Sequence, residues 1–122
     1  MEDLVRDISA AAGLEPDTAR KAIGIVLDFI QKSVSPEQSA AVIDKVPGGR
    51  EAAAAAAEDE AEGGGTAAPG LMGLANRLMS EGVGMGDMQA LGRVMFDYLR
   101  GKAGDDAVGE LAGAIPGLGQ FM

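Results

Sequence analysis

The spacing of apolar residues is the feature of this 122-residue chain that most restricts its fold. Apolar side chains recur every three to four residues almost throughout, and no stretch shows the strict alternation that is typical of a β-strand. The chain therefore predicts an all-α protein. We expect three helices before residue 50 and three after residue 70, with an Ala-, Glu- and Gly-rich segment between them.

Signals for helix ends are clearest in the first half of the chain. Gly13 follows an apolar stripe over residues 2–12, and glycine suits the left-handed residue after a helix end. Pro16 fits the first turn of a second helix, whose broad apolar stripe predicts a central position. Ser35 is a candidate N-cap of a third helix, and Gln38 three residues later can complete a capping box.

Residues 50–70 differ from the rest of the chain. The alanines at 52–57 have high helix propensity, but the segment has no large apolar side chain to anchor a helix. Three consecutive glycines follow at 63–65. We therefore interpret 50–70 as a flexible linker, made of a frayed or partly helical arm and a glycine hinge.

The two halves match each other at a constant offset of 69 residues, without a gap from residue 13 to residue 48. The matched features are Gly13 with Gly82, Asp28-Phe29-Ile30 with Asp97-Tyr98-Leu99, Val42 with Leu111, Val46 with Ile115, and Pro47-Gly48 with Pro116-Gly117. A unit of about 50 residues without a disulfide or a metal is only marginally stable on its own. We therefore expect a six-helix bundle, in which two similar three-helix units, 1–49 and 71–122, share one core about a pseudo-two-fold axis. The alternative is one irregular six-helix bundle, whose halves match because amphipathic helices resemble one another.

This pattern resembles a known kind of protein. Its short helices, the Ser35-Pro36-Glu37 helix start, the repeated Pro-Gly stops and the Gly/Ala-rich linker look like those of small bacterial helical proteins catalogued only as domains of unknown function. The resemblance covers most of the chain except the linker. It implies a helical bacterial protein and supplies no catalytic residues.

The residue inventory excludes several kinds of chemistry. The chain has no cysteine and no histidine, so it lacks a thiol nucleophile, a Ser-His-Asp triad and the usual ligands of structural zinc. Its net charge is −9, and the segments 1–49, 50–70 and 71–122 each hold more acidic than basic residues. Such a chain repels a phosphate backbone. We expect no enzyme, no cofactor, no metal site and no nucleic-acid partner, and no specific small molecule is indicated.

Asp28 and Asp97 occupy equivalent positions in the two halves. They could form a two-carboxylate site for acid–base catalysis or a divalent metal if the long helices cross there. This carboxylate-dependent metal protein or enzyme is the alternative function. The simpler interpretation is that each residue is solvated or ion-paired, since Lys32 follows Asp28 by one helical turn and Arg93 precedes Asp97 by one.

Methionines are concentrated in the second half of the chain. Flexible thioethers suit a surface that adapts to varied apolar partners, although they also fill gaps in ordinary cores. The candidate partner-binding residues are Met72, Met79, Met85, Met88 and Met95.

The glycines within the two long helices are a further candidate feature. Glycine costs about 1 kcal/mol relative to alanine in a helix interior. Gly24 and Gly92 therefore predict close packing with a neighbouring helix. We expect a leucine at either position to destabilise the fold.

Elimination leaves a non-enzymatic helical interaction module, which binds a protein partner or itself through an apolar helix surface. The acidic start of the chain and the lack of cysteine favour a cytoplasmic location. A second alternative is a protein of the membrane surface or cell envelope. The stripe over residues 71–79 supports it weakly, because it lacks the Lys/Arg-rich polar face that such helices carry.

Overall fold

The computed structural model describes residues 2–46, 48–62 and 71–114 and is all-α over these ranges. It contains seven helices there and no strand, which confirms the predicted fold class. The helices are α1 (Glu2–Ala12), α2 (Pro16–Ser33), α3 (Pro36–Ile43), α4 (Gly49–Glu62), α5 (Leu71–Ser80), α6 (Met85–Ala103) and α7 (Asp105–Ala114).

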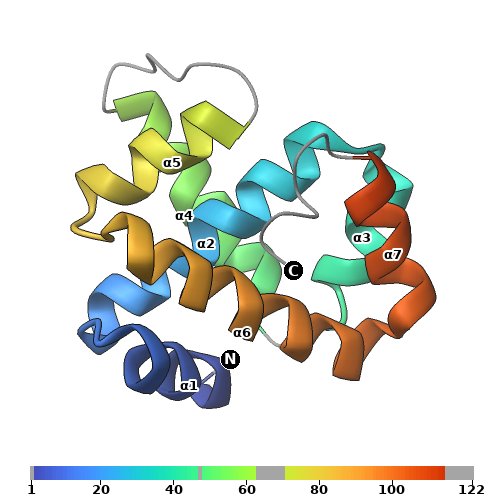
Figure 1. Cartoon of the computed structure of the whole chain (residues 1–122). Coiled ribbons are helices and arrows are strands. Elements are labelled where there is room, and N and C mark those ends of the chain that lie inside the picture. Colours follow the sequence, from blue (N-terminus) through green and yellow to red (C-terminus); the bar gives the residue numbers. More distant parts are fainter. Residues whose placement is uncertain (1, 47, 63–70, 115–122) are drawn as a thin grey trace.

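Helix α2 runs through the middle of the molecule, and the other helices surround it (Figure 1). It contacts α1, α3, α4 and α5, and its closest neighbour is α4. Helix α6 contacts α1, α3, α5 and α7. The predicted central position of the second helix is confirmed, because its residues from 22 to 28 are buried without interruption.

Local signals place the helix ends as expected in the first half. Gly13 follows α1 with φ +70°, a left-handed conformation that costs glycine little. Pro16 is the first residue of α2. The Ser35 hydroxyl accepts a hydrogen bond from the Gln38 backbone N–H at 3.3 Å and thereby caps α3. Helix α3 ends at Ile43, before the expected Pro-Gly stop, and Val46 is buried beyond its end.

Helix α4 makes the helix count seven, where the sequence predicted six. Residues 50–62 of the expected flexible linker belong to α4, which is a regular helix against α2. Ala53 and Ala56 are buried in that contact region, and a Cβ built on Gly24 would lie 2.5 Å from the Ala52 carbonyl oxygen. A large apolar anchor is not needed here, because Gly24 lets α4 approach so closely that alanine is large enough. The expected hinge at 63–65 and the second Pro-Gly stop at 116–117 lie outside the described residues.

The helix boundaries follow the 69-residue offset found in the sequence. Helices α1, α2 and α3 begin at residues 2, 16 and 36, and α5, α6 and α7 begin at residues 71, 85 and 105. The turns before α2 and α6 each contain a glycine with positive φ, Gly13 at +70° and Gly82 at +94°. Helix α4 has no described counterpart at this offset.

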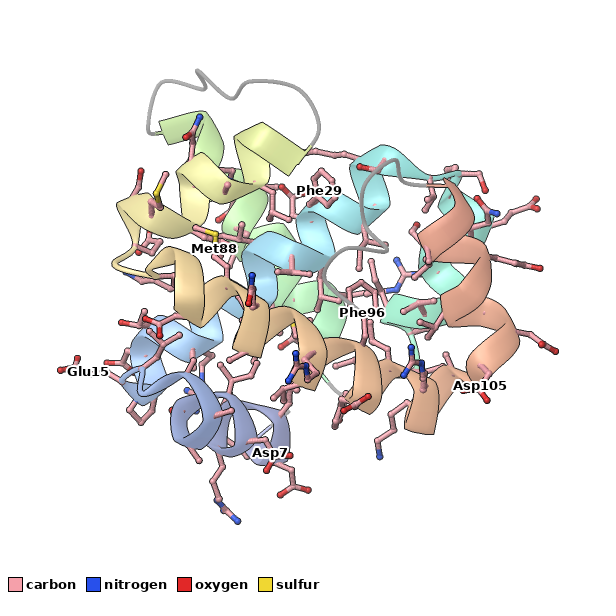
Figure 2. The ribbon with its side chains drawn as sticks, in the orientation of Figure 1. Asp7, Glu15, Phe29, Met88, Phe96 and Asp105 are labelled. Carbon is pink, nitrogen blue, oxygen red and sulfur yellow. The ribbon has the colours of Figure 1, made fainter. Side chains whose placement is uncertain are left out.

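The core is one cluster that draws on both halves of the chain. Figure 2 shows Phe29, Met88 and Phe96 among the helices, whereas the charged side chain of Asp105 lies at the edge of the molecule. The largest fully buried side chains come from α1, α2, α3, α6 and α7 and from the turn before α6. They are Leu4, Ile8, Ile23, Leu27, Ile30, Leu91, Met95, Leu99, Leu111, Val42, Val83 and Val108.

Candidate functional site

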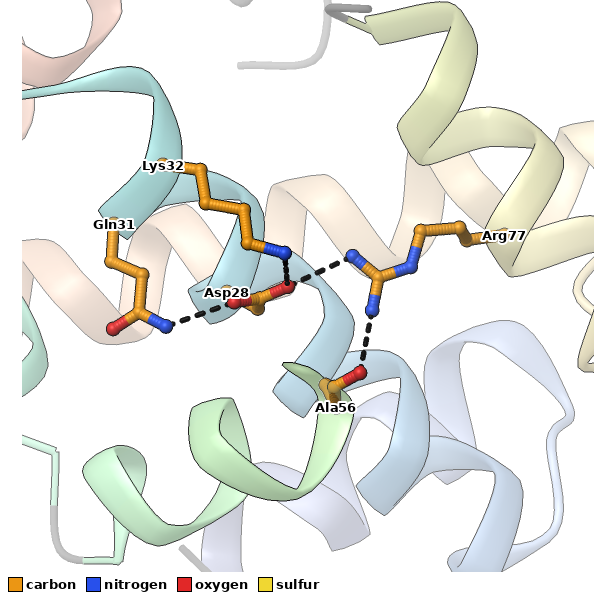
Figure 3. Close-up of polar contacts among 5 residues, drawn as sticks. All are labelled: Asp28, Gln31, Lys32, Ala56 and Arg77. Carbon is orange, nitrogen blue, oxygen red and sulfur yellow. Dashed lines mark hydrogen bonds and ion pairs between the residues drawn. The ribbon is translucent and has the colours of Figure 1, made fainter. Parts of the chain in front are cut away.

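A buried charge on the central helix organises the most polar part of the interior. The Asp28 side chain is 0% exposed. Its Oδ1 accepts a hydrogen bond from Gln31 Nε2 at 2.8 Å. Its Oδ2 lies 2.9 Å from Lys32 Nζ and 3.0 Å from Arg77 Nη1 (Figure 3). The carboxylate is thus compensated by an amide and two cations, as a buried charge requires.

These partners also determine the pKa of Asp28. Burial alone raises the pKa of a carboxyl group, because it disfavours the charged form. The hydrogen bonds from Gln31, Lys32 and Arg77, together with the charge of Lys32, outweigh burial and hold the pKa of Asp28 below its ordinary value. Asp28 is therefore ionised at neutral pH.

Arg77 connects three helices at this site. Its Nη1 donates to Asp28 on α2, and its Nη2 donates to the Ala56 carbonyl oxygen on α4 at 2.9 Å (Figure 3). The Arg77 side chain itself belongs to α5 and is 16% exposed. Sequence reasoning found the Asp28–Lys32 pair but missed Arg77 and Gln31. The available signal was that Arg77 occupies, at the 69-residue offset, the position of Ile8 in α1, where an apolar residue is expected.

Asp97, the counterpart of Asp28, lies in a different environment. Its side chain is 68% exposed and pairs with Arg100 at 3.4 Å, rather than with the expected Arg93. In the described residues, none of the hydrogen-bond or ion-pair partners of Asp28 is a carboxylate. The structure therefore places one aspartate in a buried ion pair and the other at the surface.

The methionines of the second half also separate by environment. Met88 and Met95 are buried in the core. Met79 on α5 is 48% exposed. Met72 and Met85 belong to α5 and α6, but their side chains lie outside the described part of the structure. Of this predicted set, Met79 is thus the described side chain that a partner can reach.

A pocket of about 290 Å³ lies where the end of α2 meets α3 and the start of α4. Arg50 at its edge donates through Nε and Nη2 to the carboxylate of Asp44, which holds the pKa of Asp44 below its ordinary value. The cation of this pocket is therefore already paired with a carboxylate of the same chain. The lining residues are Gln31, Pro36, Ser39, Ala40, Ile43 and Arg50.

Searches for other kinds of site gave two further findings. Within 2–46, 48–62 and 71–114, no three His, Cys, Asp or Glu residues form a group that could hold a metal ion. None of the helices in these ranges is both long and apolar enough to cross a membrane.

Comparison of the chain with family models, with curated proteins and with solved structures gave no match. The resemblance to bacterial domains of unknown function thus stays a prediction.

Proposed function

We propose that this protein is a non-enzymatic helical interaction module that presents an apolar surface of α5 to a protein partner. A cytoplasmic location, argued from the sequence, is part of this proposal. The module consists of two similar three-helix units, which share one core about a pseudo-two-fold axis. Helix α4 is an addition to the first unit.

The contacts between helices support the two-unit arrangement. The first helix of each unit packs against the long helix of the other, α1 on α6 and α5 on α2. The third helices, α3 and α7, contact each other. Exchanging the two units converts the first two contacts into each other and the third into itself, which supports the proposed axis. Each unit then covers the apolar side of its partner.

The exposure of Met79 is the observation that carries the partner-binding function. Among the described residues, Met79 is the large hydrophobic residue whose side chain is exposed. Ala75, one helical turn before it, is half-buried on the same face of α5. An exposed methionine adapts to an apolar partner at small cost, since its side chain is unbranched and polarizable.

A site-specific photocrosslinker tests this surface. Benzoyl-phenylalanine is placed at position 79 and, as a matched control, at the exposed position of Ala10 on α1. Irradiation in extract of the host cell is expected to give a discrete adduct from position 79 and none from position 10. Excess wild-type protein should compete the adduct away, whereas the Met79→Lys protein should not.

Two further results decide the proposal. Equal adducts at positions 79 and 10, or competition by Met79→Lys as efficient as by wild type, would show that α5 is not the binding surface. Sedimentation of wild type and Met79→Lys over a range of concentrations separates the two kinds of partner. A wild-type dimer that Met79→Lys abolishes identifies a second copy of this chain, and a wild-type monomer identifies a different protein.

A further inference from the structure

Helix α4 is held to the molecule by unusually small groups. Among the described side chains of α4, those of Ala53 and Ala56 are buried. The α4 backbone at Ala52 lies directly over Gly24 of α2. Helix α1, by contrast, buries Leu4, Val5 and Ile8. Apolar stabilisation scales with the area removed from water, so α4 gains far less from its side chains than α1 does.

Helix α5 is anchored differently from its counterpart α1. The side chains of α5 are described for residues 74–80, and of these only Leu78 is buried. Where α1 carries the buried Ile8, α5 carries Arg77. Water reaches the Arg77 side chain, which is 16% exposed, and the same guanidinium bonds both Asp28 and the Ala56 carbonyl. One polar side chain therefore joins α5 to α2 and to α4 at once.

We propose that α4 and α5 form a flap, latched to Asp28 by Arg77, that opens from α2 and α6 as one unit while α1, α2, α3, α6 and α7 stay packed. Local openings of this kind involve the elements with the fewest buried apolar contacts. Opening separates Arg77 from Asp28 and exposes the α2 face that contains Gly24 and Asp28, while the bond from Arg77 to the Ala56 carbonyl keeps α4 and α5 together. This device does not depend on the binding of a partner at Met79.

Native-state amide hydrogen exchange of the full chain, followed by NMR, tests the flap. Helices as short as α4 and α5 are marginally stable in water once detached, so in the wild type we expect amides at 52–57 and 75–80 to exchange through a shared opening, faster than amides of α1 and α6. Arg77→Met removes the bond that latches the flap to Asp28 and the bond to the Ala56 carbonyl. It is expected to raise exchange at 52–57 and 75–80 at least tenfold and to change exchange in α1 and α6 by less than threefold.

Arg93→Met is the matched control, because Arg93 is an exposed arginine of α6, and it should leave every helix unchanged. Arg77→Lys is a milder variant that keeps a charge near Asp28, but an ammonium cannot span two acceptors as the guanidinium fork does. It should raise exchange at 52–57 and 75–80 by a smaller factor, and it decides the test if Arg77→Met does not fold. A uniform rise in all helices, or a rise in α5 with α4 unchanged, would overturn the proposal.

Discussion

The two long helices, α2 and α6, bury the same five positions of their apolar stripes at the 69-residue offset. These pairs are Ala19 and Met88, Ala22 and Leu91, Val26 and Met95, Leu27 and Phe96, and Ile30 and Leu99. At two positions one turn apart, a buried residue of α2 corresponds to an exposed residue of α6. Gly24 and Asp28 are buried on α2, whereas their counterparts Arg93 and Asp97 are exposed on α6.

Helix α4 accounts for this difference. It covers α2 at Gly24, and its Ala56 carbonyl shares Arg77 with Asp28. A residue under such a cover must be very small or, if charged, fully compensated. Neither requirement applies to Arg93 and Asp97, because α4 does not cover that face of α6 and both residues are exposed. The same helix pattern therefore supports a core face in one half of the molecule and a solvated face in the other.

The largest expected effect comes from removing each aspartate in turn. Asp28→Ala removes a buried carboxylate that bonds Gln31, Lys32 and Arg77, and it should lower the free energy of unfolding by about 2–4 kcal/mol. Asp97→Ala removes an exposed pair and should change it by less than about 0.5 kcal/mol. Urea denaturation at neutral pH measures both. Equal losses in the two variants would mean that the cover of α4 does not distinguish the two sites.

The next effect concerns the close approach at Gly24. Gly→Ala within a helix normally stabilises by about 1 kcal/mol. Here the new Cβ would lie 2.5 Å from the Ala52 carbonyl oxygen, so α4 must move away. We expect Gly24→Ala to destabilise by about 1–3 kcal/mol, and Gly24→Leu by more. Arg93→Ala at the equivalent position of α6 should fall within about 0.5 kcal/mol of wild type. A gain in melting temperature for Gly24→Ala would contradict the packing described.

The pH dependence of stability is a further test of the difference between Asp28 and Asp97. The folded-state pKa of Asp28 is lower than its unfolded value, which is about 3.9. Its contribution to stability is therefore complete above that unfolded value and is lost as the pH falls through the folded pKa. As the pH is lowered from the unfolded pKa to the folded pKa, the free energy of unfolding should decrease more steeply for wild type than for Asp28→Asn. Asp97→Asn is the control that removes one surface carboxylate. Parallel curves for wild type and Asp28→Asn would refute this role.

The sequence predicted the helices whose stripes contain large apolar residues, because their period and their end signals are local. Gly13, Pro16 and Ser35 mark ends through backbone conformation and capping, which depend on a few adjacent residues. Helix α4 was not predicted as a stable helix. Its stability depends on Gly24, which is distant in the sequence and makes the alanine face sufficient.

The candidate site was predictable only in part, for the same physical reason. Asp28 and Lys32 lie one helical turn apart, so their pairing follows from sequence spacing. The bond from Arg77 depends on the docking of α5 against α2, which no local pattern specifies. The expected equivalence of Asp28 and Asp97 did not extend to their surroundings, because α4 covers only α2 at the position concerned.

Substitutions at the starts of α3 and α7 should change stability least. Ser35 caps α3, whereas the equivalent residue before α7 is Gly104, with φ +95°. Ser35→Ala should cost about 1 kcal/mol, and Ser35→Gly only a few tenths, measured by thermal unfolding. Transferring the cap as Gly104→Ser should not stabilise α7, since a residue with a Cβ is strained at that φ. If Gly104→Ser raises the melting temperature, the two helix starts are interchangeable, and the difference between the halves is confined to the face that α4 covers.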